Sequence, residues 1–453
     1  MNKAYEFFSI SGINALPRFG NEKIVSNDQL IRPRSRSVAL YIHIPFCKSI
    51  CQFCMLRKGA TAVSEVPDGF LDTLLSEMEL YRESLEGVQI STIYFGGGTP
   101  SMLSYQQFER IIAELFHLFS IVPGVEITFE GEAASLKNND LLKALKNNRV
   151  ARVSFGLQTF DERIRKVLGR TDELADLYTV RERLEVIGFT EVNIDYIYNL
   201  PDTDLEFLSG DLAHLKTFAP TSVDCHPLKY VSCSSFMLRQ IMENKMTIPD
   251  AQLRIAMYRL IRQWMSQNGY VEQFADQYSK KDLSDTNIYM KHLYGLSGGE
   301  YIGFGPGARS HFGDFGSTNA QQTDNYNKLI NAGKLPVEKR VYAPLADNFI
   351  TCFPKRNDKL TLEAIGLSTD PAYFTEKLEG LKNQGYLNFD DRGYVLTPEG
   401  LNWYQNLQEE LLSPDQLNRH METAKQRVNK LNYFNGYFDG LGGLLATTSI
   451  KTA

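Results

Sequence analysis

The stretch YIHIPFCKSICQFC, residues 41–54, places three cysteines directly after a β-rich run. Cys47, Cys51 and Cys54 form one Cys-x3-Cys-x2-Cys loop, and no second knuckle adds the fourth ligand that structural zinc requires. Three thiolates instead suit an iron–sulfur cubane whose remaining iron stays open to a small molecule. The spacing therefore predicts a [4Fe–4S] cluster with these three cysteines as its metal ligands, at the catalytic centre.

The other cysteines, Cys225, Cys233 and Cys352, are scattered along the chain. Six cysteines in 453 residues do not make a disulfide scaffold, which is typical of much shorter secreted chains. We therefore expect the scattered three to be small, buried apolar side chains.

The composition is that of a folded protein of enzyme size. Hydrophobic residues make up 43% and charged residues 23% of the chain, as in an ordinary globular protein with more than one domain. The net charge of −6 gives no general attraction to nucleic acid, so we expect no nucleic-acid partner. Neither a signal-peptide pattern nor an apolar run of about 18 residues occurs, so we expect a cytoplasmic protein with no membrane partner.

Short β-rich runs alternate with helical segments over residues 37–312, which is the pattern of parallel βα units. Apolar residues at helical spacing indicate helices around residues 70–78 and 108–118. An open sheet and a partial barrel are both compatible with such units. The expected strands are 38–45, 92–96, 125–130, 151–157, 191–198 and 222–228, with 301–305 as a candidate closing element.

Residues with useful chemistry lie at one end of these expected strands. Cys47 follows the first strand, and a glycine-rich segment that ends in Thr99 follows the second. Glu130 ends the third strand, Gln158 follows the fourth, and Asp195 lies in the fifth. Because the carboxyl ends of parallel strands share one edge of a sheet, we expect a single active-site face there.

Beyond about residue 340 the pattern changes to short helices and then a hairpin, as in a winged-helix module. The module has no obvious basic stripe, which favours packing or substrate covering over DNA binding. A regulator that senses redox state through the cluster and binds DNA is a third possibility. The expected division is an N-terminal extension (1–36), a barrel (37–312), a linker (313–340), the winged-helix-like domain (341–432) and a flexible tail (433–453).

Six motifs together resemble the radical S-adenosylmethionine (SAM) superfamily, and more closely its branch of oxygen-independent coproporphyrinogen III dehydrogenases and their relatives. The resemblance implies an α/β fold, a partial (β/α)6 radical SAM barrel with a C-terminal winged-helix-like α+β domain. The motifs are YIHIPFCKSICQFC (41–54), YFGGGTPS (94–101), ITFEGE (127–132), VSFGLQTFDERIRKVLGR (153–170), VNIDYIYNLP (192–201) and IGFGPGARS (302–310).

The resemblance also implies how the cofactors are used and held. SAM would bind the open iron, and one electron from the cluster would cleave it to a 5′-deoxyadenosyl radical. A one-electron reductant such as flavodoxin or ferredoxin is therefore an expected partner. Tyr41 and Phe53 would flank the cluster and SAM, and Gly97, Gly98 and Thr99 would lie along the SAM methionyl group, because glycine lets backbone N–H groups approach a ligand closely.

Four polar residues complete the implied cofactor site. Glu130 would bind the amino group of SAM through a charge-assisted hydrogen bond. This branch is expected to hold a second SAM beside the first, and the resemblance assigns Gln158, Arg170 and Asp195 to it, with Asp195 suited to ribose hydroxyls. A proton acceptor, if the reaction needs one, is not settled by the sequence, and His226, Tyr230 and Glu272 are three conceivable residues.

The chain departs from two of the related patterns. The coproporphyrinogen dehydrogenases carry a further cysteine where this chain has Leu56, and the heme-chaperone relatives carry tyrosine where it has Phe53. These departures favour a third subgroup, the class C radical SAM methylases and cyclopropanases. We therefore expect transfer of a SAM-derived C1 unit, by methylation or cyclopropanation, to an sp² carbon of an aromatic or tetrapyrrole-like substrate. Oxidative decarboxylation of coproporphyrinogen III and a heme chaperone of the same fold are the alternatives.

Overall fold

The computed structural model describes residues 31–412 apart from a few short gaps. The gaps are 55, 57–59, 231–232, 284–285 and 297. Most of the expected N-terminal extension and all of the expected tail at 433–453 lie outside the described residues. None of the described helices has both the length and the apolar character needed to cross a lipid bilayer.

One twelve-stranded sheet organises the molecule. Six strands run parallel in the order β1-β4-β5-β6-β7-β8, and β11 lies parallel to β1 on its other side. They match the expected runs, because strands covered on both faces are nearly continuously apolar. Their bounds are β1 (Ser37–Ile44), β4 (Gln89–Gly97), β5 (Ser120–Gly131), β6 (Arg152–Gln158), β7 (Glu191–Tyr198), β8 (Ser222–Pro227) and β11 (Tyr301–Phe304).

The sheet stays open, as a partial barrel does. β8 pairs antiparallel with β10 (Gln277–Lys280), which in turn pairs with β9 (Tyr270–Phe274). β11 pairs with β1 at the far side of the parallel array, so it extends the sheet there and does not close it against β8. The α/β class and the partial barrel are thus confirmed.

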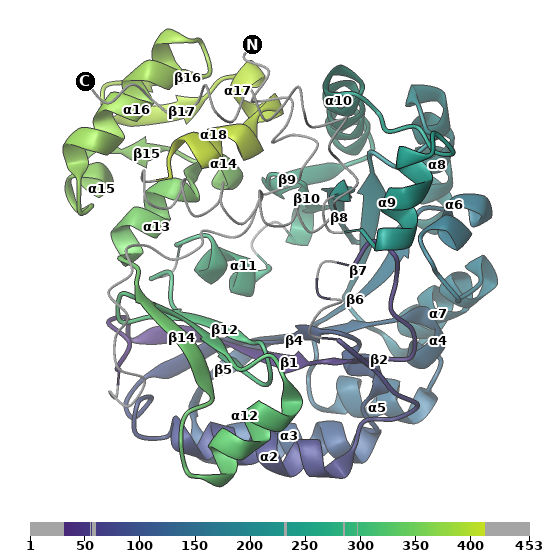
Figure 1. The fold of residues 1–453 in the computed structure, drawn as a ribbon, viewed down its shortest axis with the longest axis vertical. Helices are drawn as coiled ribbons and strands as arrows, with labels where there is room; N and C mark the ends of the chain where they lie inside the picture. The colour runs from purple at the N-terminus through teal and green to yellow at the C-terminus, as the bar shows by residue number, and fades with distance from the viewer. Residues whose placement is uncertain are drawn as a thin grey trace.

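Helices connect the parallel strands and cover their outer side, as Figure 1 shows. The two helices expected from apolar spacing are α2 and α3, whose apolar residues lie in the main core. α3 begins with a capping box between Ser104 and Gln107. The helices of this part are α2 (Asp68–Leu80), α3 (Tyr105–Leu118), α4 (Ala133–Leu136), α5 (Asn139–Asn147), α6 (Glu162–Val167), α7 (Leu174–Ile187), α8 (Leu205–Phe218), α9 (Ser235–Met242), α10 (Ala251–Gln267) and α11 (Ile288–Leu293).

The expected linker at 313–340 is instead part of the large sheet. β12 (Arg309–Phe312), β13 (Phe315–Asn319) and β14 (Val337–Tyr342) form an antiparallel meander, and α12 (Thr323–Asn331) joins the last two. The turn between β12 and β13 has φ of 58° at Gly313 and 65° at Asp314, the positive values that a tight hairpin needs. The polar composition concealed these strands, because they lie toward the edge of the sheet.

A second core forms the C-terminal domain. Its three strands are ordered β15-β17-β16 and lie among short helices, in a winged-helix-like arrangement. Ile255 of α10 packs into this core, which joins it to the barrel. The elements are α13 (Leu345–Thr351), α14 (Phe353–Arg356), β15 (Leu360–Thr361), α15 (Leu362–Gly366), α16 (Pro371–Asn383), β16 (Leu387–Asp390), β17 (Gly393–Leu396), α17 (Pro398–Asn402) and α18 (Tyr404–Glu410).

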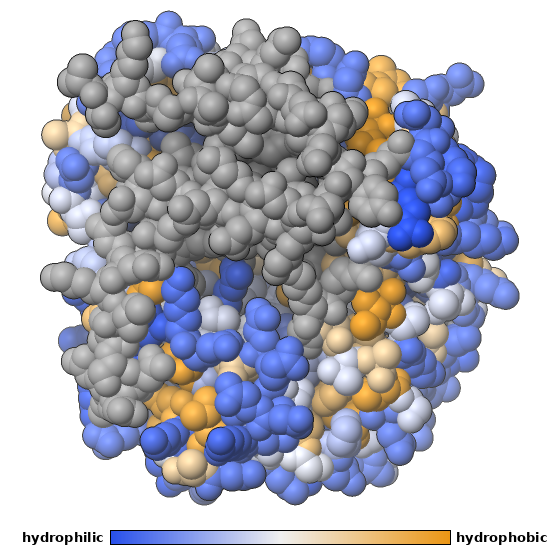
Figure 2. All heavy atoms as spheres, viewed as in Figure 1, coloured by the Kyte–Doolittle hydropathy of each residue, from blue (hydrophilic) through white to orange (hydrophobic). Residues whose placement is uncertain are grey.

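The described surface is mainly hydrophilic on the face drawn in Figure 2. Apolar residues form separate groups between the hydrophilic ones on this face. Large apolar side chains that are well exposed, such as Val186, Phe236 and Leu367, lie on different elements. Single exposed apolar residues of this kind are ordinary on globular proteins.

Candidate active site at the carboxyl ends of the parallel strands

The two ends of the cysteine loop are joined to each other, and its middle is joined to the barrel. β2 (Phe46–Cys47) pairs in parallel with β3 (Thr61–Ala62), and the N–H of Val63 donates to the carbonyl of Cys47 at 3.0 Å. Within the loop, the N–H of Gln52 donates to the carbonyl of Leu168 at 2.9 Å. The loop that carries Cys47, Cys51 and Cys54 is therefore held close to the segment that follows α6.

The glycine-rich segment lies directly against the start of this loop. The N–H of Gly98 donates to the carbonyl of Ile44 and the N–H of Thr99 to that of Phe46, each at 2.7 Å. A Cβ on Gly98 would stand 2.5 Å from the carbonyl oxygen of Phe46, so this approach requires glycine. Gly97 has φ of 113°, which also favours glycine.

The environment of the sulfurs fits an iron–sulfur cluster. Burial raises the pKa of the Cys47 thiol to about 11, and the hydrogen bond from Thr99 Oγ1 to its Sγ, at 3.5 Å, opposes this. Burial also raises the pKa of Cys51, while the Arg170 guanidinium, 3.7 Å from its Sγ, lowers it. Both donors would stabilise the thiolates that a cluster binds.

The arrangement does not suit one isolated metal ion. Across the described residues, no three His, Cys, Asp or Glu side chains gather as the ligands of a single ion would. A cubane does not require such convergence, because each cysteine binds a different iron. The cluster's assignment to Cys47, Cys51 and Cys54 therefore stays a prediction that the donor set and its neighbours support.

Glu130 lies near the end of β5, next to the backbone of the glycine-rich segment. Its carboxylate accepts a hydrogen bond from the Tyr94 hydroxyl at 2.5 Å, and a Cβ on Gly96 would stand 3.0 Å from its Oε2. Burial raises its pKa, against the hydrogen bonds from Tyr94 and from the backbone of Gly97. A cationic ligand would hold this carboxylate ionised, which is the role expected of it toward the SAM amino group.

Gln158 is a strained residue with an unused acceptor. It adopts φ of 71° at the end of β6, a conformation that residues other than glycine rarely take. Its side chain is 6% exposed, and its amide oxygen has no hydrogen-bond partner among the described residues. Gly156 makes room for it, since a Cβ there would stand 2.4 Å from the Gln158 Nε2. A buried acceptor without a donor fits a residue that binds a ligand.

Arg170 and Asp195 differ in their polar contacts, since Arg170 is held by ion pairs and Asp195 by a hydrogen bond. Arg170 forms ion pairs with Glu132 at 3.0 Å and Asp172 at 2.9 Å, and its Nη1 lies 3.7 Å from Cys51 Sγ in the cysteine loop. Asp195 accepts a hydrogen bond from Ser154 Oγ at 3.4 Å, and burial raises its pKa to about 7 with further effects from Asp224 and Glu130. Their roles toward a second SAM stay predictions.

The two expected aromatic residues lie in different surroundings. The Tyr41 ring stacks on Tyr94 and Tyr289, with centroids 6.0 and 5.8 Å away, and its hydroxyl lies 3.1 Å from His43 Nδ1. Phe53 packs instead against a separate apolar cluster that includes Ile164 and Leu168. Sequence inspection missed Tyr94 and Tyr289; Tyr94 stands two residues before Gly96 on the same strand, which was the available signal.

Of the three conceivable proton acceptors, two are fully occupied. The Tyr230 hydroxyl donates to the carbonyl of Asn199 at 2.8 Å, and Glu272 accepts from Tyr258 and Arg262, each at 3.1 Å. His226 at the end of β8 is accessible to solvent, yet burial lowers its pKa to about 4.

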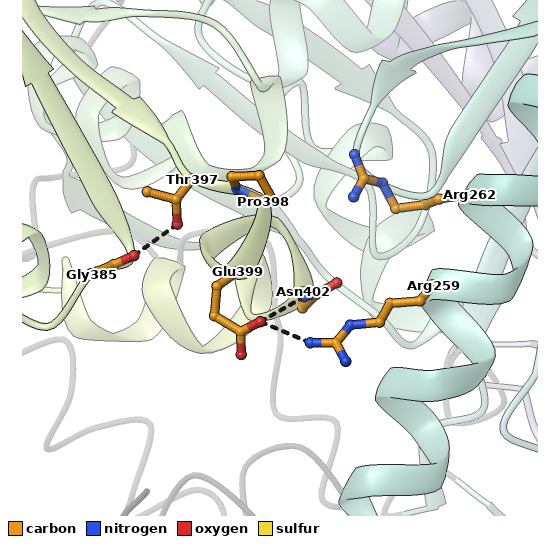
Figure 3. Close-up of a pocket in the computed structure, with 7 residues that line it drawn as sticks. All are labelled: Arg259, Arg262, Gly385, Thr397, Pro398, Glu399 and Asn402. Carbon is orange, nitrogen blue, oxygen red and sulfur yellow. Dashed lines mark hydrogen bonds and ion pairs between the residues drawn. The ribbon is translucent and has the colours of Figure 1, made fainter.

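A surface pocket lies elsewhere, between α10 and the C-terminal domain (Figure 3). An ion pair of 2.8 Å joins Arg259 and Glu399 across it, and none of the expected site residues lines it. The pocket is therefore separate from the candidate active site. Its lining residues are Arg259, Arg262, Gly385, Thr397, Pro398, Glu399 and Asn402.

Comparison with known proteins places the chain among related sequences. The family model of the radical SAM superfamily matches residues 41–209. The heme chaperone HemW of Lactococcus lactis is 30% identical over 302 residues, which cover 66% of this chain and 75% of that protein. The oxygen-independent coproporphyrinogen III oxidase of Bradyrhizobium diazoefficiens is 26% identical over 316 residues, which cover 68% of this chain and 70% of that protein.

A solved structure has the same fold. Coproporphyrinogen III oxidase (HemN) from Escherichia coli, a radical SAM enzyme, aligns with a TM-score of 0.69 and 21% identity. The alignment covers 85% of this chain and 91% of that structure, so the likeness includes more than the matched family segment.

These relatives correct the expected reaction. C1-unit transfer is wrong as the leading function, because the relatives bear the names of a heme chaperone and of coproporphyrinogen III oxidases. Neither is named a methyltransferase or cyclopropanase. Leu56 lies outside the three cysteines, and one substituted position there does not define the chemistry. The chain belongs to the radical SAM superfamily, in the branch of the oxygen-independent coproporphyrinogen III oxidases and their relatives, and its cofactors are a [4Fe–4S] cluster and SAM.

Proposed function

We propose that this radical SAM enzyme oxidises a tetrapyrrole, and that oxygen-independent conversion of coproporphyrinogen III is the reaction supported best. The observation that carries the proposal is the clamp between the glycine segment and the cysteine loop beside the Glu130 carboxylate. The similarity to a coproporphyrinogen III oxidase over 68% of the chain supports the substrate class.

Each site residue has a definite task in this proposal. When bound, the cluster and SAM supply a 5′-deoxyadenosyl radical that removes a hydrogen atom from the substrate. Cys47, Cys51 and Cys54 hold the cluster, and Glu130 holds the SAM amino group. Gln158 offers its unpartnered amide oxygen to a donor on a ligand, which would be a second SAM molecule.

Other groups of the chain protect the reaction. The rings of Tyr41, Tyr94 and Tyr289 pack on one another and Tyr94 contacts Glu130, so their apolar surface would limit access of water to the radical. The C-terminal domain is joined to the barrel through Ile255, and in this proposal it covers the substrate. A flavodoxin or ferredoxin would supply the electron.

A heme chaperone is the second candidate. The relative that is 30% identical over 66% of this chain is a heme chaperone, which supports this candidate. In that case the protein would bind heme at the same face without turning over coproporphyrinogen III.

Product analysis under anaerobic conditions tests the proposal. The reconstituted protein is given SAM, a one-electron reductant and coproporphyrinogen III, and mass spectrometry follows tetrapyrrole decarboxylation and 5′-deoxyadenosine. We expect both products, and neither from Cys51→Ala. Stoichiometric heme binding without any decarboxylated tetrapyrrole would contradict the oxidase and favour the chaperone.

A further inference from the structure

The cysteine loop is packed together with two helices of the barrel. The N–H of Gln52 donates to the carbonyl of Leu168 after α6 at 2.9 Å, and the N–H of Ser234 before α9 donates to the carbonyl of Gln52 at 2.6 Å. Phe53 packs into an apolar cluster that contains buried residues of both helices. Figure 1 shows α6 and α9 next to one another. The loop and the two helices therefore form one continuous unit.

This unit presents mainly positive charge to solvent, although the whole chain has a net charge of −6. Basic side chains outnumber acidic ones among the exposed residues of the described cysteine loop, of α6, and of α9 with the turn after it. The exposed basic residues are Lys48, Arg163, Lys166, Arg239 and Lys245, and the exposed acidic ones are Glu162 and Glu243. The ion pair of 2.7 Å between Lys245 and Glu243 cancels one charge of each sign. The remaining positive charge would attract an acidic partner.

Two large apolar side chains are exposed on the same unit. Leu56 in the cysteine loop is 46% exposed, and Phe236 in the first turn of α9 is 62% exposed. Burial of such side chains contributes affinity between proteins, while charged residues around them set the rate and the orientation of docking. A small surface of mixed character is typical of the short-lived complexes that electron carriers form.

The residues expected to bind the cluster belong to this unit. Cys47, Cys51 and Cys54 are part of the loop itself, and each of them is partly exposed. Cys51 is also the neighbour of Gln52, whose backbone contacts the ends of both helices. An electron that enters through the loop therefore reaches the cluster ligands without crossing the barrel.

We propose that an acidic one-electron carrier protein docks on the surface formed by the cysteine loop, α6 and α9. This inference rests on the proposed function, which needs an electron from outside the chain, and it names the surface through which that electron enters. The carrier is oxidised by one electron and the cluster is reduced by the same electron, so the step needs no further oxidant or reductant. The positive charge of the surface brings the carrier to the loop, and Leu56 and Phe236 supply the apolar contact.

Binding of an acidic flavodoxin tests the inference without turnover. Reconstituted holoprotein is titrated anaerobically with oxidised flavodoxin, and isothermal titration calorimetry gives the Kd at low and at high salt. We expect Lys166→Glu on α6 and Arg239→Glu on α9 each to raise the Kd about tenfold, and high salt to raise the wild-type Kd. Lys166→Arg should bind as the wild type does. The control is Lys328→Glu, an exposed position on α12 between the edge strands β13 and β14, which should also leave the Kd unchanged.

Reduction of the cluster gives a second measurement, followed by its visible absorbance. At subsaturating concentrations, reduced flavodoxin should reduce the cluster about tenfold more slowly in Lys166→Glu and Arg239→Glu than in the wild type. Dithionite is a small reductant that needs no docking surface, so it should reduce the cluster equally fast in all variants. A slower reaction with dithionite as well would show that the substitutions act on the cluster and would contradict a docking role.

The outcomes separate this inference from the proposed function. Wild-type affinity for flavodoxin in correctly folded Lys166→Glu and Arg239→Glu would overturn the docking surface, and so would a wild type that binds no flavodoxin. Wild-type dimers that both glutamate variants abolish in size-exclusion chromatography would assign the surface to a second copy of the chain instead. Should one variant fail to fold, as judged by thermal unfolding, the other decides the question. The proposed function is tested independently, because decarboxylation of coproporphyrinogen III with dithionite as reductant does not require this surface.

Discussion

Three glycines at this site matter because the absence of a side chain leaves room for a neighbouring group. Gly96 lets the Glu130 carboxylate approach the backbone, Gly98 lets two loops join, and Gly156 makes room for Gln158. The sequence predicted Gly98 from its motif, whereas the need for Gly156 depends on the rotamer of a residue two positions away. Contacts between distant segments, such as Arg170 with Cys51, leave no local pattern and were not predictable.

Gly98→Ala tests the clamp between the glycine segment and the cysteine loop. The added methyl group would stand 2.5 Å from the carbonyl oxygen of Phe46, so the two loops must separate. We expect the free energy of unfolding to fall by about 1–3 kcal/mol and SAM affinity to decrease. Denaturant unfolding and equilibrium dialysis with SAM measure both.

Gly210→Ala is the matched control, because a Cβ there meets nothing within 4 Å in the interior of α8. It should raise stability by about 0.5–1 kcal/mol and leave SAM affinity unchanged. Equal SAM affinity in Gly98→Ala and wild type would show that the clamp does not shape the cofactor site.

The Asp195 carboxyl should make stability depend on pH. Its pKa is raised from 3.8 to about 7 in the folded protein, so the folded state retains a proton that the unfolded state releases. Its contribution to stability is therefore present at low pH and is lost as pH rises from about 4 to about 7. Asp195→Asn should remove this loss, so its stability relative to wild type should increase over that interval.

Urea unfolding at several pH values measures this difference. Glu206→Gln, an exposed substitution on α8, serves as the control and should follow the wild-type curve. A constant difference between Asp195→Asn and wild type at all pH values would show that Asp195 does not titrate there.

The strands of the sheet differ in how well they can be predicted from the sequence. The parallel strands are apolar on both faces and were predicted within a few residues, apart from the earlier starts of β4 and β5. β13, with the sequence FGSTN, has no such pattern, and hydrogen bonds to β12 and β14 hold it in the sheet. Polar strands at an edge therefore depend on turn geometry, which the Gly313-Asp314 pair supplies.

Gly313→Ala tests this turn against Gly333→Ala. Both glycines have positive φ, 58° and 68°, so both substitutions carry a similar backbone penalty of about 1 kcal/mol. Only the Cβ at Gly313 also meets neighbours, at 2.6 Å from Ile31 Cγ2, whereas nothing lies within 4 Å at Gly333. Gly313→Ala should therefore lose more stability in denaturant unfolding, and an equal loss would contradict the close packing.

At the scale of the whole molecule, two large apolar cores stabilise the fold. The larger core lies between the sheet and its helices, and the smaller one fills the C-terminal domain and takes in Ile255 of α10. The sequence predicted both parts from their periodicity. It could not predict how they meet, because that contact depends on pairs such as Tyr404 with Asp276, which are 128 residues apart.

The pairing of β2 with β3 joins the two ends of the cysteine loop without any metal, which bears on how the protein acquires iron. Cys47, Cys51 and Cys54 belong to none of the apolar cores of the described residues, while backbone hydrogen bonds and the packing of Phe46 and Phe53 hold their loop in place. The chain is therefore expected to fold before the cluster is inserted. We expect the protein to stay folded as an apoprotein when oxygen destroys the cluster. Added iron and sulfide should then restore the cluster without unfolding and refolding.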